Sequence, residues 1–325
     1  MSDRQADTQA IYRHFGTVEA PGNSDLYAGL ALGVADDAEA LALIGRLPAA
    51  KQQVNLIFGA ARYLGAPFTT YEDFREWLVG HWASVEAMAS SRATQTNEAG
   101  RCAVLLPVLS RLPGPLALLE VGASAGLCLY PDRYSHRYRT SGGTTALDPA
   151  GGVSPVQLDC VIEAGPAPSL LPEIAWRTGV DLNPLDPADP DTLRWLDALI
   201  WPEHEDRRRR LREALDVAAA HPARVVRGDL LTKLPELIER APGGTKLVVF
   251  HTAVLSYLSA PDVQRFAALV RADPRVTWVS NEHAGVLPEV DARVPMPAPG
   301  NRMILAVNGE PVALTHPHGR SYRPL

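Results

Sequence analysis

The sequence predicts an α/β protein in which an all-helical region precedes a doubly wound, mostly parallel β-sheet. Up to about residue 113, apolar residues recur at spacings of three and four, and no strand pattern interrupts them. From about residue 115 onward, short β-branched runs alternate with helical segments, which is typical of a parallel sheet with helices on both faces. We therefore expect a helical domain over residues 1–113, covering the binding edge of the sheet, and an α/β domain over 114–325.

The helical region divides into six segments at breaks that contain Pro or Gly. Thr70, with Asp73 three positions later, resembles an N-capping pair at the start of the fifth segment. The six segments read QAIYRHFGTV, LYAGLALGV, AEALALIGRL, VNLIFGAARYLGA, YEDFREWLVGHWASVEAMA and EAGRCAVLLPVLSRL.

Five strands and a closing hairpin are expected in the α/β region. Asp189-Pro190 and Ser259 mark the starts of two of its helices. Asn308-Gly309 is the expected turn of the final hairpin, and a β-hairpin is inserted near 134–165. The five strands are expected at 116–121, 174–183, 223–231, 246–255 and 276–282.

Composition and charge restrict the class of function. The chain of 325 residues is 46% hydrophobic and 21% charged, within the range of soluble globular proteins. A net charge of −6 offers no electrostatic basis for binding nucleic acid or an anionic membrane. The three cysteines lack metal-ligand spacing, no stretch reaches the length of a membrane span, and the N-terminus lacks the apolar core of a signal peptide. We expect a cytoplasmic protein with free thiols.

The turn after the first strand, GASAG at 122–126, fits two chemistries. As G-x-S-x-G it matches the nucleophile elbow of a serine hydrolase, with Ser124 as the attacking group. An elbow normally follows several strands, however, whereas only helices precede this turn. The chain also lacks an upstream Gly-rich segment for a second oxyanion donor, and an elbow has no use for the adjacent Glu120. The hydrolase remains the alternative.

The same turn is also typical of a site for a nucleotide-bearing cofactor. A Gly-rich turn brings the backbone close to a ligand, and the segment after it looks like the start of a helix, whose N-terminus attracts anions. Acidic residues at later strand ends could bind ribose hydroxyls or an adenine amino group, although such acids also cap helices. The cofactor-binding residues predicted from the turn and the strand ends are Glu120, Gly122, Ala123, Ser124, Gly126, Asp181 and Asp229.

Candidate catalytic residues follow the fourth strand. His251 could act as a general base, with Thr252 and Tyr257 beside it; the alternative for His251 is a buried core histidine. Asn281-Glu282-His283 ends the fifth strand, where it could contact substrate. One His–Glu cluster without a third placed ligand does not predict a metal site.

The first strand, the E-x-G-x-S-x-G turn, the strand-end acids and the terminal hairpin together resemble a class I S-adenosylmethionine-dependent methyltransferase. The resemblance implies a seven-stranded Rossmann-like sheet whose last strand is antiparallel, and S-adenosylmethionine as cofactor. The polar run before the sheet is expected near the turn, where Arg101 could meet the carboxylate of the methionine moiety; the alternative is that this run only caps its helix and faces solvent. Ser124 stands where the family usually has Gly. Asp181 lies farther from the turn than the usual spacing of about 20 residues, which the insertion near 134–165 explains.

The family's N/D-P-P-Y motif is absent after the fourth strand, which argues against methylation of DNA bases or protein amides. Together with the acidic charge, this favours a small-molecule substrate. The missing middle Gly also disfavours NAD, and a non-catalytic nucleotide-binding protein remains a further alternative.

Nearly the whole chain also resembles a bacterial family known only as a domain of unknown function (number 2332). The resemblance implies kinship and a shared fold but no activity, because none is assigned to the family. The resembling segments are TQTNEAGR at 94–101, EVGASAGLCLYPDRY at 120–134, VDLNPLD at 180–186, LIWPE at 199–203 and VVFHTAVLSYL at 248–258.

Overall fold

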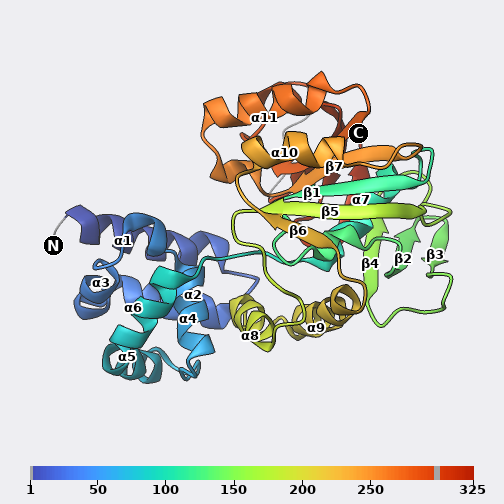
Figure 1. Ribbon diagram of the computed structural model, residues 1–325. Helices are drawn as coiled ribbons and strands as arrows, with labels where there is room; N and C mark the ends of the chain where they lie inside the picture. Colours follow the sequence, from blue (N-terminus) through green and yellow to red (C-terminus); the bar gives the residue numbers. More distant parts are fainter. Residues whose placement is uncertain (1–2, 296–300) are drawn as a thin grey trace. The chain divides into compact units, whose positions relative to one another are not determined.

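The computed structural model describes residues 3–295 and 301–325, and the chain divides into two compact units (Figure 1). The helical unit comprises Met1–Thr96 and Asp189–Arg209, and the sheet unit comprises Asn97–Ala188 and Arg210–Leu325. The helical unit thus ends before the expected boundary at 113 and includes a later segment that the sequence analysis assigned to the α/β domain.

Predicted capping residues begin two helices of the helical unit. The Thr70 hydroxyl accepts a hydrogen bond from the Asp73 N–H at 3.2 Å, and Asp189 caps the helix that starts at Pro190. Both predictions are confirmed. The helices of this unit are α1 (Asp3–His14), η1 (Phe15–Glu19), α2 (Asp25–Ala35), α3 (Ala38–Ile44), η2 (Ala49–Lys51), α4 (Val54–Tyr63), α5 (Tyr71–Gly80), α6 (Trp82–Ser91) and α8 (Pro190–Leu199).

Helix α8 packs into the helical unit although it follows the strand β5 in sequence. The Arg62 guanidinium donates to the Ala198 carbonyl at 3.1 Å. A Cβ atom on Gly59 would lie 2.7 Å from the Leu199 side chain, so α4 and α8 approach closely. Aromatic rings fill the adjacent core, where Phe58 lies 5.0 Å from Tyr27 between ring centroids.

The sheet unit is built on one mixed, mostly parallel sheet with the strand order β3-β2-β4-β11-β10-β9-β8-β7-β1-β5-β6 (Figure 1). Strands β8, β7, β1, β5 and β6 run parallel to one another, and β9 pairs antiparallel with β8. The strands are β1 (Leu116–Val121), β2 (Ser135–Thr140), β3 (Gly143–Leu147), β4 (Gln157–Ile162), β5 (Ile174–Asp181), β6 (Arg224–Arg227), β7 (Lys246–Thr252), β8 (Val276–His283), β9 (Met303–Val307), β10 (Glu310–Thr315) and β11 (Ser321–Pro324).

The described residues form an eleven-stranded sheet, so the expectation of seven strands was wrong in number. The five parallel strands and the hairpin turn at Asn308-Gly309, with φ angles of 52° and 85°, are as predicted. The insertion near 134–165 contains a hairpin, but its strands are β2 and β3. The segments at 134–140 and 156–164, which were expected to form it, contain β2 and β4, and these two strands pair in parallel. The short strand β11, which the sequence analysis missed, pairs with both β10 and β4 and so joins these strands to the main sheet.

Helices α10 and α11 pack on one face of the sheet. Their apolar residues join Leu119, Val121 and Val249 in one buried cluster. The Ser259 hydroxyl caps α11 by accepting from the Asp262 N–H at 3.3 Å, as predicted. The remaining helices in the described part of the sheet unit are η3 (Ala99–Arg101), α7 (Cys102–Leu109), η4 (Leu127–Leu129), most of α9 (Glu205–Ala220), α10 (Leu230–Glu239), η5 (Leu255–Tyr257), α11 (Ala260–Ala272) and α12 (Pro288–Asp291).

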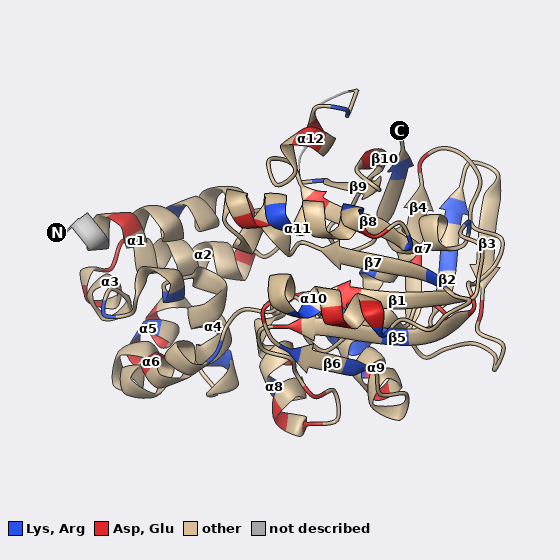
Figure 2. Cartoon of the chain, turned by 45° about the horizontal axis from the view of Figure 1, so that its top comes forward, with Lys and Arg blue, Asp and Glu red and all other residues tan. Residues whose placement is uncertain are grey.

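Acidic and basic residues are interspersed along the chain (Figure 2). In α9, for example, Arg208 pairs with Glu205 at 2.9 Å and with Asp197 of α8 at 3.4 Å. Within residues 3–295 and 301–325, no helix combines the length and the apolar character that a membrane span requires.

Candidate functional site

The strand order changes direction at β1, which lies between β5 and β7. The chain reaches β5 and β6 on one side of β1 and then crosses to β7 and β8 on the other side. Ligands of such sheets bind outside the carboxyl ends of the strands at this point. Glu120 and the turn 122–126 lie at the carboxyl end of β1, so a ligand of this sheet is expected to bind beside them.

The backbone of the turn is left-handed at three positions. Gly122, Ser124 and Gly126 have φ angles of 69°, 51° and 71°. For Ser124 this conformation costs about 1–2 kcal/mol, because its Cβ lies close to the following carbonyl. At Gly122 a Cβ would also lie 2.5 Å from the Val254 side chain, so only glycine fits there.

The expected helix after the turn does not form, and that part of the prediction was wrong. Only the short 3-10 helix η4 (Leu127–Leu129) follows Gly126. Pro131 restricts Tyr130 to non-helical conformations, which ends η4 and leaves no room for a longer helix. The turn therefore has no helix N-terminus with which to attract an anion.

All five amide N–H groups of residues 122–126 donate hydrogen bonds within the sheet unit. With no N–H group left over, the turn cannot cradle a phosphate through its backbone, as Gly-rich loops at helix N-termini do. The bonds run from Gly122 and Ala123 to the Val180 carbonyl (2.8 and 3.2 Å), from Ser124 to Asp181 Oδ2 (2.8 Å), from Ala125 to Asn97 Oδ1 (3.0 Å) and from Gly126 to the Ala123 carbonyl (2.6 Å).

Two side chains hold the turn in place of a helix. Asp181, at the end of β5, accepts from the Ser124 N–H through Oδ2 and from the Asn183 N–H through Oδ1. Asn97 accepts from the Ala125 N–H, and its Nδ2 donates to the Ser124 hydroxyl at 2.9 Å. The predicted residues Ser124 and Asp181 thus lie together. Each Asp181 oxygen keeps a second lone pair with which it could accept a ribose hydroxyl.

Glu120 is a buried carboxyl with an unsatisfied oxygen. It is 5% exposed, and its Oε2 atom has no hydrogen-bond partner in the described part of the chain. Burial and the nearby Cys128 hold the pKa of Glu120 well above its ordinary value, whereas Arg101 acts to lower it. A buried polar oxygen without a partner costs about 1–3 kcal/mol. A ligand that donated a hydrogen bond or brought a positive charge would remove this cost.

Arg101 lies near Glu120 and is fixed by three hydrogen bonds. Its Nη1 donates to the Thr252 carbonyl at 2.9 Å and to the Thr252 hydroxyl at 3.0 Å, and its Nε donates to the Pro317 carbonyl at 3.0 Å. Arg101 is 6% exposed, and no described residue accepts a hydrogen bond from its Nη2. A rigid guanidinium with a remaining donor can bind an anionic group.

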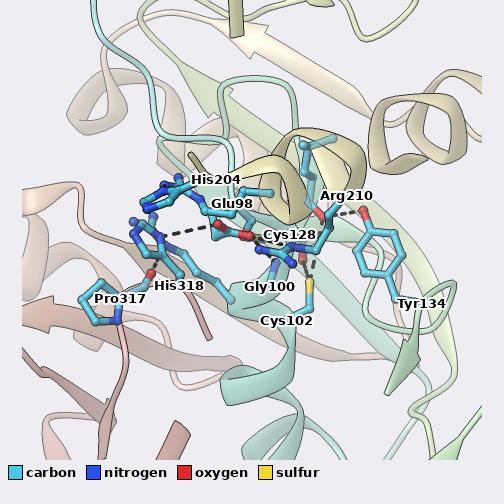
Figure 3. A network of polar contacts seen from close by, with 12 residues as sticks. Glu98, Gly100, Cys102, Cys128, Tyr134, His204, Arg210, Pro317 and His318 are labelled. Carbon is cyan, nitrogen blue, oxygen red and sulfur yellow. Dashed lines mark hydrogen bonds and ion pairs between the residues drawn. The ribbon is translucent and has the colours of Figure 1, made fainter. Parts of the chain in front are cut away.

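A buried network around Glu98 fixes the segment that carries Arg101 (Figure 3). Glu98 Oε1 accepts from the Gly100 N–H and from Arg210 Nε, both at 3.0 Å, and Oε2 lies 3.5 Å from His318 Nδ1. The Cys128 thiol donates to the Glu98 carbonyl at 3.5 Å. The residues just before Arg101 are thereby held by Arg210 of α9, by His318 of the C-terminal segment and by Cys128, which also lies near Glu120.

The structure places His251 in the core, the alternative that the sequence left open. Its Nε2 accepts from the Trp278 indole N–H at 2.9 Å, so Nδ1 carries the proton and donates to Glu282 Oε1 at 2.6 Å. His251 is 0% exposed. Both ring nitrogens are engaged, which leaves His251 no nitrogen for a substrate.

The other predicted site residues are less closely associated. Asp229 is exposed and caps α10 by accepting from the Thr232 N–H at 3.2 Å, the structural role that strand-end acids often have. Tyr257, in η5, is 76% exposed. Thr252 is buried and supports Arg101. Asn97 belongs to the polar run that was expected near the turn, but nothing in its local pattern indicates its contact with Ser124.

The hydrolase alternative lacks a base in this geometry. In the described part of the chain, the side-chain partner of the Ser124 hydroxyl is the Asn97 amide, which cannot accept its proton. A nucleophile elbow also needs a helix after the turn, and here η4 stands instead. Nor do residues 3–295 and 301–325 contain a cluster of three or more His, Cys, Asp or Glu side chains that could hold a metal ion.

The two side-chain contacts of Asn97 lead to a stability prediction. Asn97→Ala leaves the Ala125 N–H without its acceptor, so we expect the free energy of unfolding to fall by about 1–3 kcal/mol. Ser124→Ala is the matched control: it removes only the hydroxyl contact and should cost less. Urea denaturation of the two variants and the double variant measures this. An Asn97→Ala protein as stable as the wild type would show that Asn97 does not hold the turn.

Comparisons with known proteins place the chain in a family. No curated protein and no solved structure matched it. One family model matches residues 9–323, nearly the full length, in agreement with the resemblance that the sequence segments indicated. The chain therefore belongs to the family described as "Uncharacterized protein conserved in bacteria (DUF2332)".

Proposed function

We propose that the sheet unit binds S-adenosylmethionine and transfers its methyl group to a small-molecule nucleophile. The observation that carries the proposal is the pair formed by Glu120 and Arg101 at the carboxyl end of the sheet. Glu120 offers an unsatisfied acceptor, and Arg101 offers an unused donor. The order of the parallel strands, with an antiparallel strand beside β8, supports a Rossmann-like, methyltransferase-type core with additional strands.

The two groups suit the zwitterionic end of an amino acid. An ammonium group would satisfy Glu120 Oε2, and a carboxylate would accept from Arg101 Nη2 as a charge-assisted hydrogen bond. Asp181, which holds the turn, keeps lone pairs for the ribose hydroxyls. A ligand that combines an amino acid with a nucleoside therefore fits these residues.

Cofactors with phosphate groups fit the turn less well. NAD and ATP are commonly held by free N–H groups of a Gly-rich turn at a helix N-terminus. In this chain the five N–H groups of residues 122–126 are engaged, and no helix follows them. When it is ionised, the buried carboxyl of Glu120 at the end of β1 also repels phosphate. A cationic, phosphate-free cofactor is favoured.

The protein's contribution to methyl transfer would be positioning. Bound S-adenosylmethionine supplies a methyl group that is already activated by the positive charge of its sulfur. Glu120, Arg101 and Asp181 would fix both ends of the cofactor, so that the acceptor meets the methyl group in line. Such orientation provides several kcal/mol of the reduction in barrier without strong acid–base catalysis.

Calorimetric titration tests the cofactor. We expect micromolar binding of S-adenosylmethionine and S-adenosylhomocysteine, and no comparable binding of NAD or ATP. Glu120→Gln should weaken binding about 10- to 100-fold, since it removes a charged hydrogen bond of about 1.5–3 kcal/mol. Glu236→Gln, on the exposed face of α10, is the matched control. A folded wild-type protein that binds neither sulfur compound would refute the proposal; in that event an esterase assay would test Ser124.

The raised pKa of Glu120 predicts how stability depends on pH. The folded protein holds the carboxyl proton more tightly than the unfolded chain, so this group stabilises the fold at low pH. That stabilisation is lost as the pH rises from about 4.5 through the raised pKa of the folded state. Glu120→Gln should therefore lose less stability than the wild type over this range, as measured by urea denaturation at several pH values. Parallel pH profiles would contradict the assignment.

A further inference from the structure

His283 ends β8, two strands away from β1 in the sheet. Side chains alternate along a strand, so His283 lies on the same face as Asn281. Asn281 is the register partner of Thr252 on β7, and the Thr252 hydroxyl accepts from Arg101. His283 is therefore on the face of the sheet that carries Arg101, at the carboxyl end where the proposed cofactor binds.

The ring of His283 differs from that of His251 in what it contacts. His251 has both nitrogens engaged by Trp278 and Glu282. His283 is only half-buried, and no hydrogen bond of its ring is found among the described residues. Of these two histidines at the carboxyl end, His283 is the one with a ring nitrogen available to a ligand.

The surroundings of His283 favour the neutral imidazole. Burial lowers its pKa below the ordinary value of 6.5; Glu282, on its own strand, acts to raise the pKa, and Arg101, from η3, acts to lower it. A neutral imidazole at pH 7 has a lone pair with which to accept a proton.

We propose that His283 is the general base of the methyl transfer. Through a ring nitrogen it takes the proton from the O–H or N–H group of the substrate that receives the methyl group. This inference rests on the proposed function. The oxygen or nitrogen of the acceptor forms a bond to the methyl carbon while the carbon–sulfur bond breaks, and the electron pair of that bond stays on sulfur. The acceptor's proton passes to His283 and then to solvent.

The presence of a base indicates the class of substrate. A phenol, an alcohol or a protonated amine must lose a proton when it is methylated, so its reaction gains from a base, typically by a factor of about 10²–10⁴. A carboxylate is already deprotonated at neutral pH and would gain nothing. The substrate class that His283 predicts is a hydroxyl or amino compound.

The first test observes the imidazole itself, without any substrate. In NMR spectra of the full-length protein with labelled histidine, we expect the His283 ring to titrate below pH 6.5 and its resonances to shift when S-adenosylhomocysteine is added. The His283→Asn variant assigns the signal, and calorimetry shows whether the compound binds. If the compound does not bind the wild type, the proposed function fails. If it binds while the His283 ring neither shifts nor titrates low, this inference fails on its own.

The second test measures the reaction. Radiolabelled S-adenosylmethionine is offered with a phenol, a catechol, an aliphatic alcohol, a primary amine and a carboxylic acid. We expect His283→Asn to lower kcat at pH 7 by at least about 100-fold for the substrate that is methylated, with little change in KM. At alkaline pH the rate of the variant should partly recover, because the substrate then loses its proton without the help of a base. His221→Asn, at an exposed position after α9, should leave the rate unchanged. Transfer only to the carboxylic acid, or an unchanged kcat in His283→Asn, would overturn the proposal.

Discussion

The hydrogen bond from the Ser124 N–H to Asp181 ties the turn after β1 to the end of β5, and the geometry of the candidate site depends on it. In many α/β proteins a helix after the Gly-rich turn fixes this backbone. Here the helix is missing, and Asp181 and Asn97 replace it from two other parts of the chain. This substitution keeps the left-handed conformation of Ser124 in place. It also uses the N–H groups that would otherwise bind an anion.

A buried acid and a buried guanidinium then dominate the chemistry of the site. Burial disfavours the charged form of Glu120, and Arg101 compensates for this only in part. No ion pair within 4 Å joins the two side chains among the described residues. A buried polar atom without a partner calls for an explanation in a native protein, and a bound ligand is one such explanation. The arrangement therefore favours a ligand with both a positive and a negative group.

Local patterns in the sequence were sufficient for the parallel strands and for several helix starts. The apolar runs of β1 and β7 predict buried strands, and Thr70 and Ser259 are capping residues whose partners lie three positions away. Contacts between distant segments were not predictable in this way. The pairing of β11 with β4, which raises the sheet to eleven strands, has no local signal in the short segment SYRP.

In the candidate site, too, local features were predictable and contacts between distant segments were not. Glu120, Ser124 and Asp181 could be selected because each lies at a strand end or in a turn. The role of Asn97 could not, because its contact with the turn links residues 27 positions apart. Likewise, His251 and His283 each stand at a strand end in the sequence. Only the structure shows that Trp278 and Glu282, from the strand β8 beside His251, engage both nitrogens of the His251 ring.

A crystal structure of the protein with S-adenosylhomocysteine would show directly whether Glu120 and Arg101 bind the two charged groups of an amino acid. We expect the ammonium group within about 3 Å of Glu120 Oε2 and the carboxylate at the same distance from Arg101 Nη2, a hydrogen-bonding distance in both cases. A ligand bound away from these two side chains, or bound through its adenosine alone with Glu120 Oε2 still unsatisfied, would contradict it.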